Sequence, residues 1–377
     1  MLSKEDLQRY NRQIIIPEFG KDGQEKLQNS SMLVIGAGGL GAPILQYLTA
    51  AGIGRLGIVE FDQVSISNLQ RQVLFSTNQV GESKARKTKD RLNSLNPHVN
   101  IDLHEVAINS ENALDIITHY DLVIDGSDNL ATRYLVNDAC YLLKKPLVYG
   151  AIFRFEGQVS VFNATCNGQL GPNYRDLFPT PPPPELVPSC SEGGVLGVLP
   201  GIIGAMMANE AIKILTQIGE SLSGRLFVFD ALDFTTHTLN VVKNPENPIS
   251  GDNPSIQALI DYEAFCMGNT LLKERKEISV QELKTKLDQG SVWILDVRED
   301  YEYQIVNLGG QLIPLNKVLG RKKDIPTEEE VVVLCKIGGR SRRAIELLEE
   351  QGFNNLVNLK GGINAWQEEI DPSLPKY

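Results

Sequence analysis

The sequence is short of three features, and each shortage excludes a class of protein. Its 5 cysteines are widely separated, so they do not form the disulfide framework of a small secreted domain. Its longest apolar run, residues 195–207, is interrupted by glycines and a proline and falls short of a membrane span. Basic residues are outnumbered: 36 Lys and Arg against 47 Asp and Glu give a net charge of -11, which argues against direct binding of nucleic acid.

What remains is an ordinary globular composition, with 42% hydrophobic and 22% charged residues. The length of 377 residues is typical of about two domains. Residues 1–13 are polar and charged and lack the apolar segment of a secretory signal peptide. We therefore expect a cytoplasmic protein with no membrane partner.

Alternating apolar runs and helical patterns predict an α/β fold in the first two thirds of the chain. The strand pattern of residues 31–35 is followed by a glycine turn, a helical stretch and a second apolar run at 56–62. This alternation predicts a mostly parallel sheet with helices on both faces. Runs at 157–163 and 224–231 are typical of antiparallel strands, so we expect a mixed sheet. Further strands are expected at 121–125 and 146–150, with helices at 81–95 and 130–144.

Proline-rich stretches divide the chain. Residues 179–188 hold too many prolines for a helix or a central strand and are expected to form an exposed, extended segment. Residues 244–255 are again rich in proline and lack an apolar run, which indicates a linker. Strands and helices then alternate again at the size of a small α/β domain. We therefore expect domains over 1–243 and 276–377, joined by a linker over 244–275.

The glycine turn after the first strand matches the GxGxxG fingerprint of dinucleotide-binding proteins. Gly36, Gly38, Gly39 and Gly41 allow a phosphate to approach the backbone, and the N-terminus of the following helix favours negative charge. Glu60, at the end of the next strand, stands where such folds bind a ribose hydroxyl. On these residues alone, an oxidoreductase that uses NAD or FAD fits equally well.

The residues beyond the second strand favour nucleotidyl transfer instead. Residues 60–72 place two acids, an asparagine and an arginine close together, a cluster that hydride transfer does not need. An enzyme that releases pyrophosphate needs cations for the phosphates and a carboxylate for magnesium. Lys84 and the acid pair in residues 125–129 supply them. The GxxxxGK[ST] motif is absent, so the chain is not a P-loop enzyme.

In this order, the motifs resemble those of the MoeB/ThiF-type adenylating enzymes of molybdopterin and thiamin biosynthesis, relatives of the ubiquitin-activating enzymes. The resemblance rests on RYNRQI, GAGGLG, FDxVxxSNLQRQ, GxxK and DGSDN, and covers about residues 5–243. It implies a Rossmann-like, E1-type domain. That domain would use ATP and Mg²⁺ to adenylate the C-terminal glycine of a small ubiquitin-like sulfur carrier protein.

The same resemblance implies a role for each site residue. Glu60 would hold the ribose, Asp128 would hold Mg²⁺, and Arg12 would reach into the site of a partner subunit, which implies a homodimer. The alternatives are a solvated surface cation for Arg12 and a helix cap for Asp128. The contacts to the triphosphate would be Asn68, Arg71 and Lys84, and the further nucleotide-binding residues would be Asp62, Gln72 and Asn129.

The chain departs from that family at one site. Many of its members bind zinc through two CxxC pairs, and the corresponding positions here are Asn173, Asp176, Asn247 and Ser250. These four side chains cannot form a tetrahedral thiolate site. We therefore expect no structural zinc, and a looser tie between the two segments unless packing compensates.

Cys190 follows the first proline-rich stretch. In the family that the chain resembles, this cysteine lies on a mobile crossover segment and engages the activated carrier. A thiol in an exposed loop suits a nucleophile, whereas the alternative is a small buried hydrophobe. Cys140 is expected in the core, and no role is expected for Cys166 or Cys266.

The C-terminal domain carries a cysteine loop, CKIGGR, between an apolar strand and a helix. Backbone N–H groups of the loop, with Lys336 and Arg340, are expected to stabilise an anion on Cys335. The loop resembles that of single-domain rhodaneses, as do residues 295–299, 308–314 and 361–366. The resemblance implies that Cys335 carries a persulfide. A phosphatase relative and an inactive module used only for contacts are the alternatives.

Together the two halves predict that the Gly-Gly tail of a carrier protein is activated by ATP and then attacked by the persulfide of Cys335, which gives a thiocarboxylate. Cys190 would either form an acyl intermediate or resolve an acyl-disulfide. The sulfur donor would be a cysteine desulfurase or thiosulfate. Two other classes stay open: a non-catalytic scaffold that binds the carrier, and the NAD- or FAD-dependent oxidoreductase. The molybdopterin, thiamin, cysteine and tRNA thiolation pathways are not distinguished.

Overall fold

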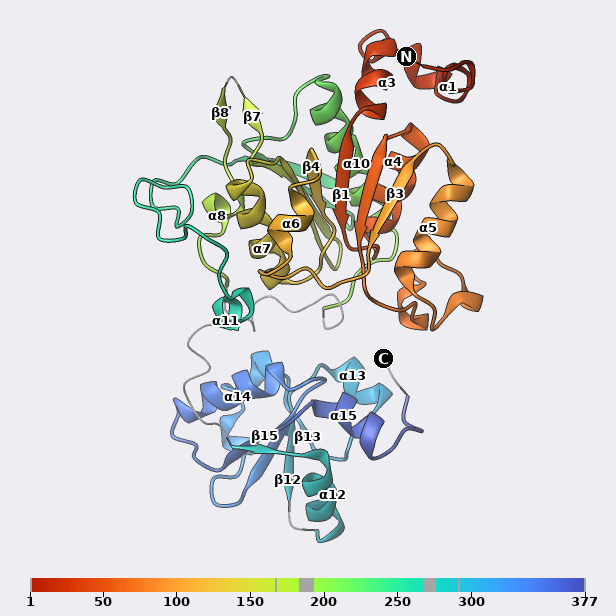
Figure 1. The fold of residues 1–377 in the computed structure, drawn as a ribbon. Helices are drawn as coiled ribbons and strands as arrows, with labels where there is room; N and C mark the ends of the chain where they lie inside the picture. Colours follow the sequence, from red (N-terminus) through yellow and green to blue (C-terminus); the bar gives the residue numbers. More distant parts are fainter. Residues whose placement is uncertain (1, 167, 183–192, 268–275, 291, 376–377) are drawn as a thin grey trace. The chain divides into compact units, whose positions relative to one another are not determined.

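The computed structural model describes residues 2–166, 168–182, 193–267, 276–290 and 292–375. These residues form two compact units (Figure 1). The first unit holds the described residues up to Cys266, and the second holds those that follow. Among the described residues, no helix has the length and apolarity that crossing a membrane requires.

Within the described residues, an eight-stranded sheet forms the centre of the first unit, with strand order β10-β9-β6-β5-β4-β1-β2-β3. The strands from β3 to β5 in this order are parallel, and β6, β9 and β10 continue the sheet in antiparallel pairs. This mixed sheet confirms the predicted fold class. The strands are β1 (Ser31–Ile35), β2 (Arg55–Val59), β3 (Asn100–His104), β4 (Leu122–Asp125), β5 (Leu147–Phe153), β6 (Glu156–Phe162), β9 (Arg225–Asp230) and β10 (Thr235–Asn240), beside a small hairpin of β7 (Thr165–Cys166) and β8 (Gln169–Leu170).

Helices cover both faces of this sheet. Successive residues of β1 point to opposite faces, so Met32 and Val34 join one apolar core and Leu33 and Ile35 join the other. Uninterrupted apolar strands of this kind are typical of parallel sheets that are buried on both faces. The helices are α1 (Lys4–Arg9), α2 (Asn11–Ile14), α3 (Gly20–Gln28), α4 (Gly41–Ala51), α5 (Lys84–Leu95), α6 (Ala113–Ile117), α7 (Leu130–Leu142), α8 (Tyr174–Leu177), α10 (Leu199–Thr216) and α11 (Tyr262–Met267).

Helix α10 was not among the predicted helices, because its sequence is interrupted by glycines and a proline. Pro200 lies in its first turn, where the missing backbone N–H costs little. Gly204 faces Pro43 of α4 so closely that a Cβ at this position would overlap the proline ring. The glycine therefore lets α4 and α10 approach one another on one face of the sheet.

Residues 244–266, most of the segment expected to be a linker, belong to the first unit. The Tyr262 hydroxyl of α11 donates to Oδ2 of Asp138 at 2.8 Å, and Asp138 also pairs with Arg175, both of these charged side chains being fully buried. The guanidinium carbon of Arg175 lies 4.7 Å from the ring centroid of Phe265. A buried ion pair is stable only when its remaining polar atoms find partners, so these contacts fix α11 to α7.

Cys140 lies in the core of α7, as predicted, and is fully buried. Burial raises the pKa of its thiol well above the usual value, and the nearby carboxyl of Asp125 adds to the effect. The thiol is therefore held in its protonated, unreactive form.

The second unit is a five-stranded parallel sheet, within its described residues, of order β11-β15-β14-β12-β13. Its helices flank two apolar cores that share the central strand β14. This small α/β unit matches the fold predicted for the C-terminal domain. Its elements are β11 (Glu277–Ile278), α12 (Val280–Asp288), β12 (Trp293–Asp296), α13 (Asp300–Ile305), β13 (Gln311–Leu312), β14 (Val331–Leu334), α14 (Gly339–Glu349), β15 (Leu356–Leu359) and α15 (Gly362–Glu369).

Candidate active sites

The glycine turn joins β1 to α4, and its glycines have different tasks. Gly36 has a φ of 88°, a conformation that side chains disfavour. A Cβ on Gly41, the first residue of α4, would collide with the carbonyl oxygen of Gly36. Gly38 and Gly39 instead line a cavity above the turn. The turn is therefore tightly packed where α4 begins and open to the cavity at Gly38 and Gly39, as a phosphate-binding turn must be.

Glu60 ties this turn to the end of β2. Its Oε2 accepts the backbone N–H of Ala37 at 2.9 Å, and its Oε1 accepts those of Phe61 and Asp62, also at 2.9 Å. The side chain is 7% exposed and lines the cavity. A carboxylate has about four acceptor positions, so one remains for a ligand hydroxyl.

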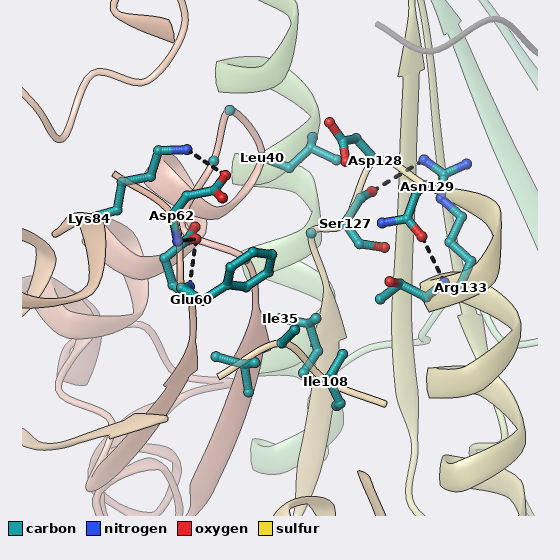
Figure 2. Close-up of a pocket in the computed structure, with 18 of the residues that line it drawn as sticks. Ile35, Leu40, Glu60, Asp62, Lys84, Ile108, Ser127, Asp128, Asn129 and Arg133 are labelled. Carbon is teal, nitrogen blue, oxygen red and sulfur yellow. Dashed lines mark hydrogen bonds and ion pairs between the residues drawn. The ribbon is translucent and has the colours of Figure 1, made fainter. Parts of the chain in front are cut away.

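A cavity of about 340 Å³ opens at the carboxyl ends of β1, β2 and β4 (Figure 2). Open α/β sheets bind ligands at this edge, and the volume lies in the range of small-molecule sites. The predicted residues that line it are Gly36, Gly38, Gly39, Glu60, Asp62, Arg71, Gln72, Lys84, Asp128 and Asn129.

Lys84 supplies a positioned cation. It is the first residue of α5, its side chain is 5% exposed, and its Nζ lies 3.1 Å from Oδ2 of Asp62 (Figure 2). Its backbone N–H also donates to the Asp62 carbonyl at 3.0 Å. The ion pair with Asp62 orients the ammonium group of Lys84. Both side chains line the cavity, so the ammonium group can still contact a bound ligand.

The acid pair after β4 divides into two different environments. Asn129, not Asp128, caps α7, because its Oδ1 accepts the N–H of Thr132 at 2.8 Å. The Asp128 carboxylate is exposed at the cavity, where it fits Mg²⁺, which commonly takes one carboxylate together with phosphate oxygens. The carboxyl of Asp125, in contrast, is buried, and burial raises its pKa. The backbone N–H of Ser127 donates to Oδ1 of Asp125 at 2.9 Å.

Three predicted residues do not line this cavity in the described part of the chain. Gly41 lies beneath the turn. Asn68 ends a 3₁₀ turn and its carbonyl accepts the N–H groups of Arg71 and Gln72. Arg12 is exposed on α2, so its role in the site of a second subunit stays a prediction.

Several lining residues were missed from the sequence. Ile108 follows β3, a strand that the apolar pattern did not indicate, and Glu263 comes from α11, in the segment expected to be a linker. Arg133 lies one helical turn after Asn129, a spacing that could have indicated it.

The Ser127 hydroxyl and Gln72 Oε1 are buried without a hydrogen-bond partner among the described residues, which is typical of atoms that meet a polar ligand.

The four positions that correspond to the family's zinc ligands form a hydrogen-bonded cluster. The Asn247 amide donates to Oδ1 of Asn173 at 3.1 Å and to Oδ1 of Asp176 at 2.7 Å. The Asn173 amide donates in turn to Oγ of Ser250 at 2.8 Å. Asn173 and Asn247 are almost fully buried. The two segments are therefore joined by packing and hydrogen bonds, the compensation that the sequence left open.

The cysteine loop of the second unit follows β14 and leads into α14. Cys335 is fully buried, and the N–H of Gly338 donates to its Sγ at 3.1 Å. Gly338 has a φ of 102°, a left-handed conformation that glycine adopts without strain. The loop thus surrounds the sulfur at the N-terminus of an eleven-residue helix, where negative charge is favoured.

Arg340 is held by a carboxylate of a neighbouring helix. Its two terminal nitrogens donate to the two carboxylate oxygens of Glu302 on α13 at 2.6 and 2.7 Å. Glu302 is buried, which raises its pKa, but the bonds from Arg340 and from the Glu299 N–H outweigh burial and lower the pKa overall. Arg340 therefore fixes the loop to α13, a contact that the sequence did not indicate.

Cys190 and the side chain of Cys166 lie outside the described residues. Cys266 is half-buried on α11, and burial raises the pKa of its thiol to about 11.

The first unit has a nucleotide-sized cavity at a glycine turn, which is typical of an E1-like adenylation unit. The second unit holds a cysteine at a helix N-terminus, which is typical of a rhodanese-like unit. The chain belongs to the ThiF family, whose model matches residues 10–249, and carries a Rhodanese-like domain over residues 279–369. It is an enzyme, an adenylyltransferase with a sulfurtransferase domain.

Proteins of known name support this assignment. A "Probable adenylyltransferase/sulfurtransferase MoeZ" of Mycobacterium tuberculosis is 47% identical over 100% of this chain and 96% of its own length. A "Sulfur carrier protein adenylyltransferase" of Thermus thermophilus is 56% identical over 70% of this chain and 98% of its own. "Adenylyltransferase and sulfurtransferase MOCS3" of Drosophila ananassae is 41% identical over 100% and 86%. A crystal structure of E. coli MccB shares the fold, with a TM-score of 0.57 and 21% identity over 67% of this chain and 75% of that one.

Proposed function

We propose that the chain adenylates the C-terminal glycine of a small ubiquitin-like sulfur carrier protein and then converts it to a thiocarboxylate with sulfur from a persulfide on Cys335. One observation carries the first half: Arg71, Lys84 and Asp128 line the same cavity as the glycine turn and Glu60. A site that binds a dinucleotide only for hydride transfer does not need this combination of cations and carboxylate.

In the adenylation step, the carboxylate of the carrier attacks the α-phosphate of ATP and pyrophosphate leaves. Glu60 accepts a ribose hydroxyl, and Lys84 and Arg71 offset the charge that moves onto pyrophosphate. Asp128 would hold Mg²⁺, which would supply further positive charge there. We also propose that Asn68 turns toward the phosphates when they bind and that Arg12 completes the site of a partner subunit, so that the enzyme is a homodimer.

In the sulfur-transfer step, the outer sulfur of the Cys335 persulfide attacks the carbonyl carbon of the adenylate, and AMP leaves with the electron pair of the C–O bond. The product is an acyl-disulfide between carrier and Cys335. Attack by the Cys190 thiolate on the Cys335 sulfur would release the thiocarboxylate and leave a Cys190–Cys335 disulfide for an external thiol to reduce. Alternatively, Cys190 forms a thioester first. A cysteine desulfurase or thiosulfate would reload Cys335.

The division of labour is tested with Cys335→Ala and a panel of carrier proteins that end in Gly-Gly. ATP–pyrophosphate exchange with one carrier, unchanged in Cys335→Ala, together with loss of thiocarboxylate formation in that variant, would support the proposal. Loss of exchange in Cys335→Ala would contradict the separation of the two steps. Absence of exchange with every carrier in folded protein would favour the non-catalytic scaffold.

A further inference from the structure

The hydroxyl of Ser341 lies among three acceptors and has one proton to give. Its Oγ lies 2.6 Å from Oδ1 of Asn358, 3.1 Å from the carbonyl oxygen of Gly338 and 3.4 Å from Sγ of Cys335. Ser341 and Asn358 are fully buried. The contact to Asn358 is the shortest of the three, so the proton is assigned to it, and a lone pair of Oγ can then face the sulfur.

The chain of donors continues away from the sulfur. Nδ2 of Asn358 on β15 donates to Oε1 of Glu277 on β11 at 2.9 Å, and the same oxygen accepts from Arg342 of α14 at 3.1 Å. Partial burial raises the pKa of Glu277, but these two donors more than offset it and lower the pKa overall. Each hydrogen bond therefore points from the cysteine loop toward a carboxylate, and such chains strengthen one another.

We propose that the Ser341 hydroxyl is a switch that responds to the charge on the Cys335 sulfur, and that Asn358 is the positioning residue that sets it. With a neutral thiol, the S–H donates to Oγ of Ser341, and Ser341 donates to Asn358. With a thiolate or a persulfide anion, the hydroxyl turns and donates to sulfur beside the N–H of Gly338. The inference rests on the proposed function, in which Cys335 must become an anion to take up sulfur from its donor.

The rotation has a cost as well as a gain. A hydrogen bond to an anionic sulfur is stronger than one to a neutral group, so Ser341 favours the anion. Turning away leaves Oδ1 of Asn358 without its donor in a buried site, so Asn358 favours the neutral thiol. The balance of the two decides how readily Cys335 becomes an anion.

The charged groups around the loop stay the same in the variants that test this. Arg340 remains paired with Glu302, and Lys336 remains in the loop. At the outer end of the chain, the charged side chains that meet are those of Glu277, Arg342 and Lys360.

The test uses the full chain with Ser341→Ala, Asn358→Leu and the double substitution. Thiolate formation on Cys335 is followed by ultraviolet absorbance against pH, each variant being compared with the same chain carrying Cys335→Ser, so that the other cysteines cancel. Ser341→Ala should raise the pH midpoint and Asn358→Leu should lower it, each by about half to one unit, as expected for one hydrogen bond. The double variant should match Ser341→Ala, because Asn358 acts on the sulfur only through its hydrogen bond with the Ser341 hydroxyl, which is absent in both variants.

Shifts in the same direction for the two single variants, or no shift in Asn358→Leu, would overturn the switch. Ser341→Thr, which keeps the hydroxyl, should restore the midpoint of the wild type. If Asn358→Leu fails to fold, Asn358→Ala replaces it with the same expectation. The titration needs only reduced protein, whereas gain of one sulfur atom on Cys335, measured by mass spectrometry, tests the proposed function separately.

Discussion

The side-chain amide of Asn247 donates to Oδ1 of Asn173 at 3.1 Å, across 74 residues of sequence. Asn247 also accepts, because its Oδ1 receives the backbone N–H groups of Ile249 and Ser250. One buried amide thus closes its own turn and joins that turn to another. A zinc ion held by four cysteines would impose the same connection, which these hydrogen bonds supply between the two segments.

Asn247→Ala should therefore destabilise the first unit by about 2–3 kcal/mol, because it removes the amide that joins Asn173 to Asp176 and leaves the backbone N–H groups of Ile249 and Ser250 without this acceptor. Urea unfolding followed by circular dichroism measures the loss, with Asn240→Ala on the exposed strand β10 as the control of no effect. A chelator should leave the wild-type curve unchanged. One tightly held zinc per chain, or a curve that shifts with chelator, would show that the cluster does not replace a metal.

Gly41 and Gly201 form a matched pair of helical glycines. Gly41→Ala should cost about 3 kcal/mol or more and abolish ATP binding, because the new Cβ collides with the backbone of Gly36. Gly201→Ala in α10 meets no atom within 4 Å, so it should stabilise the helix by up to about 1 kcal/mol. Thermal unfolding and nucleotide binding distinguish them. Equal behaviour of the two variants would mean that the glycine turn is not packed as described.

Lys84→Met should lower ATP–pyrophosphate exchange by about 10²–10³-fold, the usual effect of removing one group that stabilises charge in a transition state. Arg86→Ala, two residues further along α5, is the control: its side chain is 72% exposed and pairs with Glu105 outside the cavity. Exchange in the control should stay within about twofold of the wild type. An equal loss in both variants would assign the effect to helix α5 rather than to the cation.

The ion pair of Glu302 with Arg340 predicts a pH dependence of the second unit. The pKa of Glu302 is lowered in the folded state, so its contribution is present above the unfolded value of 4.5 and is lost as the pH falls through the folded value. Glu302→Gln should be less stable at pH 7 and should lose less stability on acidification. Both tryptophans of the chain, Trp293 and Trp366, lie in this unit, so their fluorescence reports its unfolding alone.

The control for this prediction is Glu350→Gln at the exposed end of α14, which should follow the wild type at every pH. A Glu302→Gln variant with the acid dependence of the wild type would show that other carboxylates control the transition.

The sequence predicted the elements whose signal is local. Strand β1, the glycine turn and α4 follow from an apolar run, four glycines and a helical pattern, and the cysteine loop follows from the same logic. Strands β3 and β10, which lie at the two edges of the sheet, were not predicted. Strand β10 is exposed along its whole length and therefore has no apolar face to indicate it. Edge strands are defined by a neighbour in space, which local pattern does not contain.

The site was predicted in its charged residues and missed where distant segments meet. Glu263 reaches the cavity because Tyr262 beside it is anchored to Asp138, and no spacing in the sequence reveals a bond over 124 residues. The partner of Arg340 was missed for the same reason: Glu302 lies 38 residues earlier and on another helix. Tertiary contact, rather than residue type, decided both cases.

The buried thiol of Cys140 can report the unfolding of the first unit. A thiol reagent can modify it only when α7 leaves the sheet, since the folded core excludes the reagent and keeps the thiol protonated. At low reagent concentration, the labelling rate of this one residue follows the fraction of molecules that are open at any moment. Mass spectrometry of the peptide that contains Cys140 would thus measure the stability of the adenylation unit inside a cell extract, with no added dye and no engineered probe.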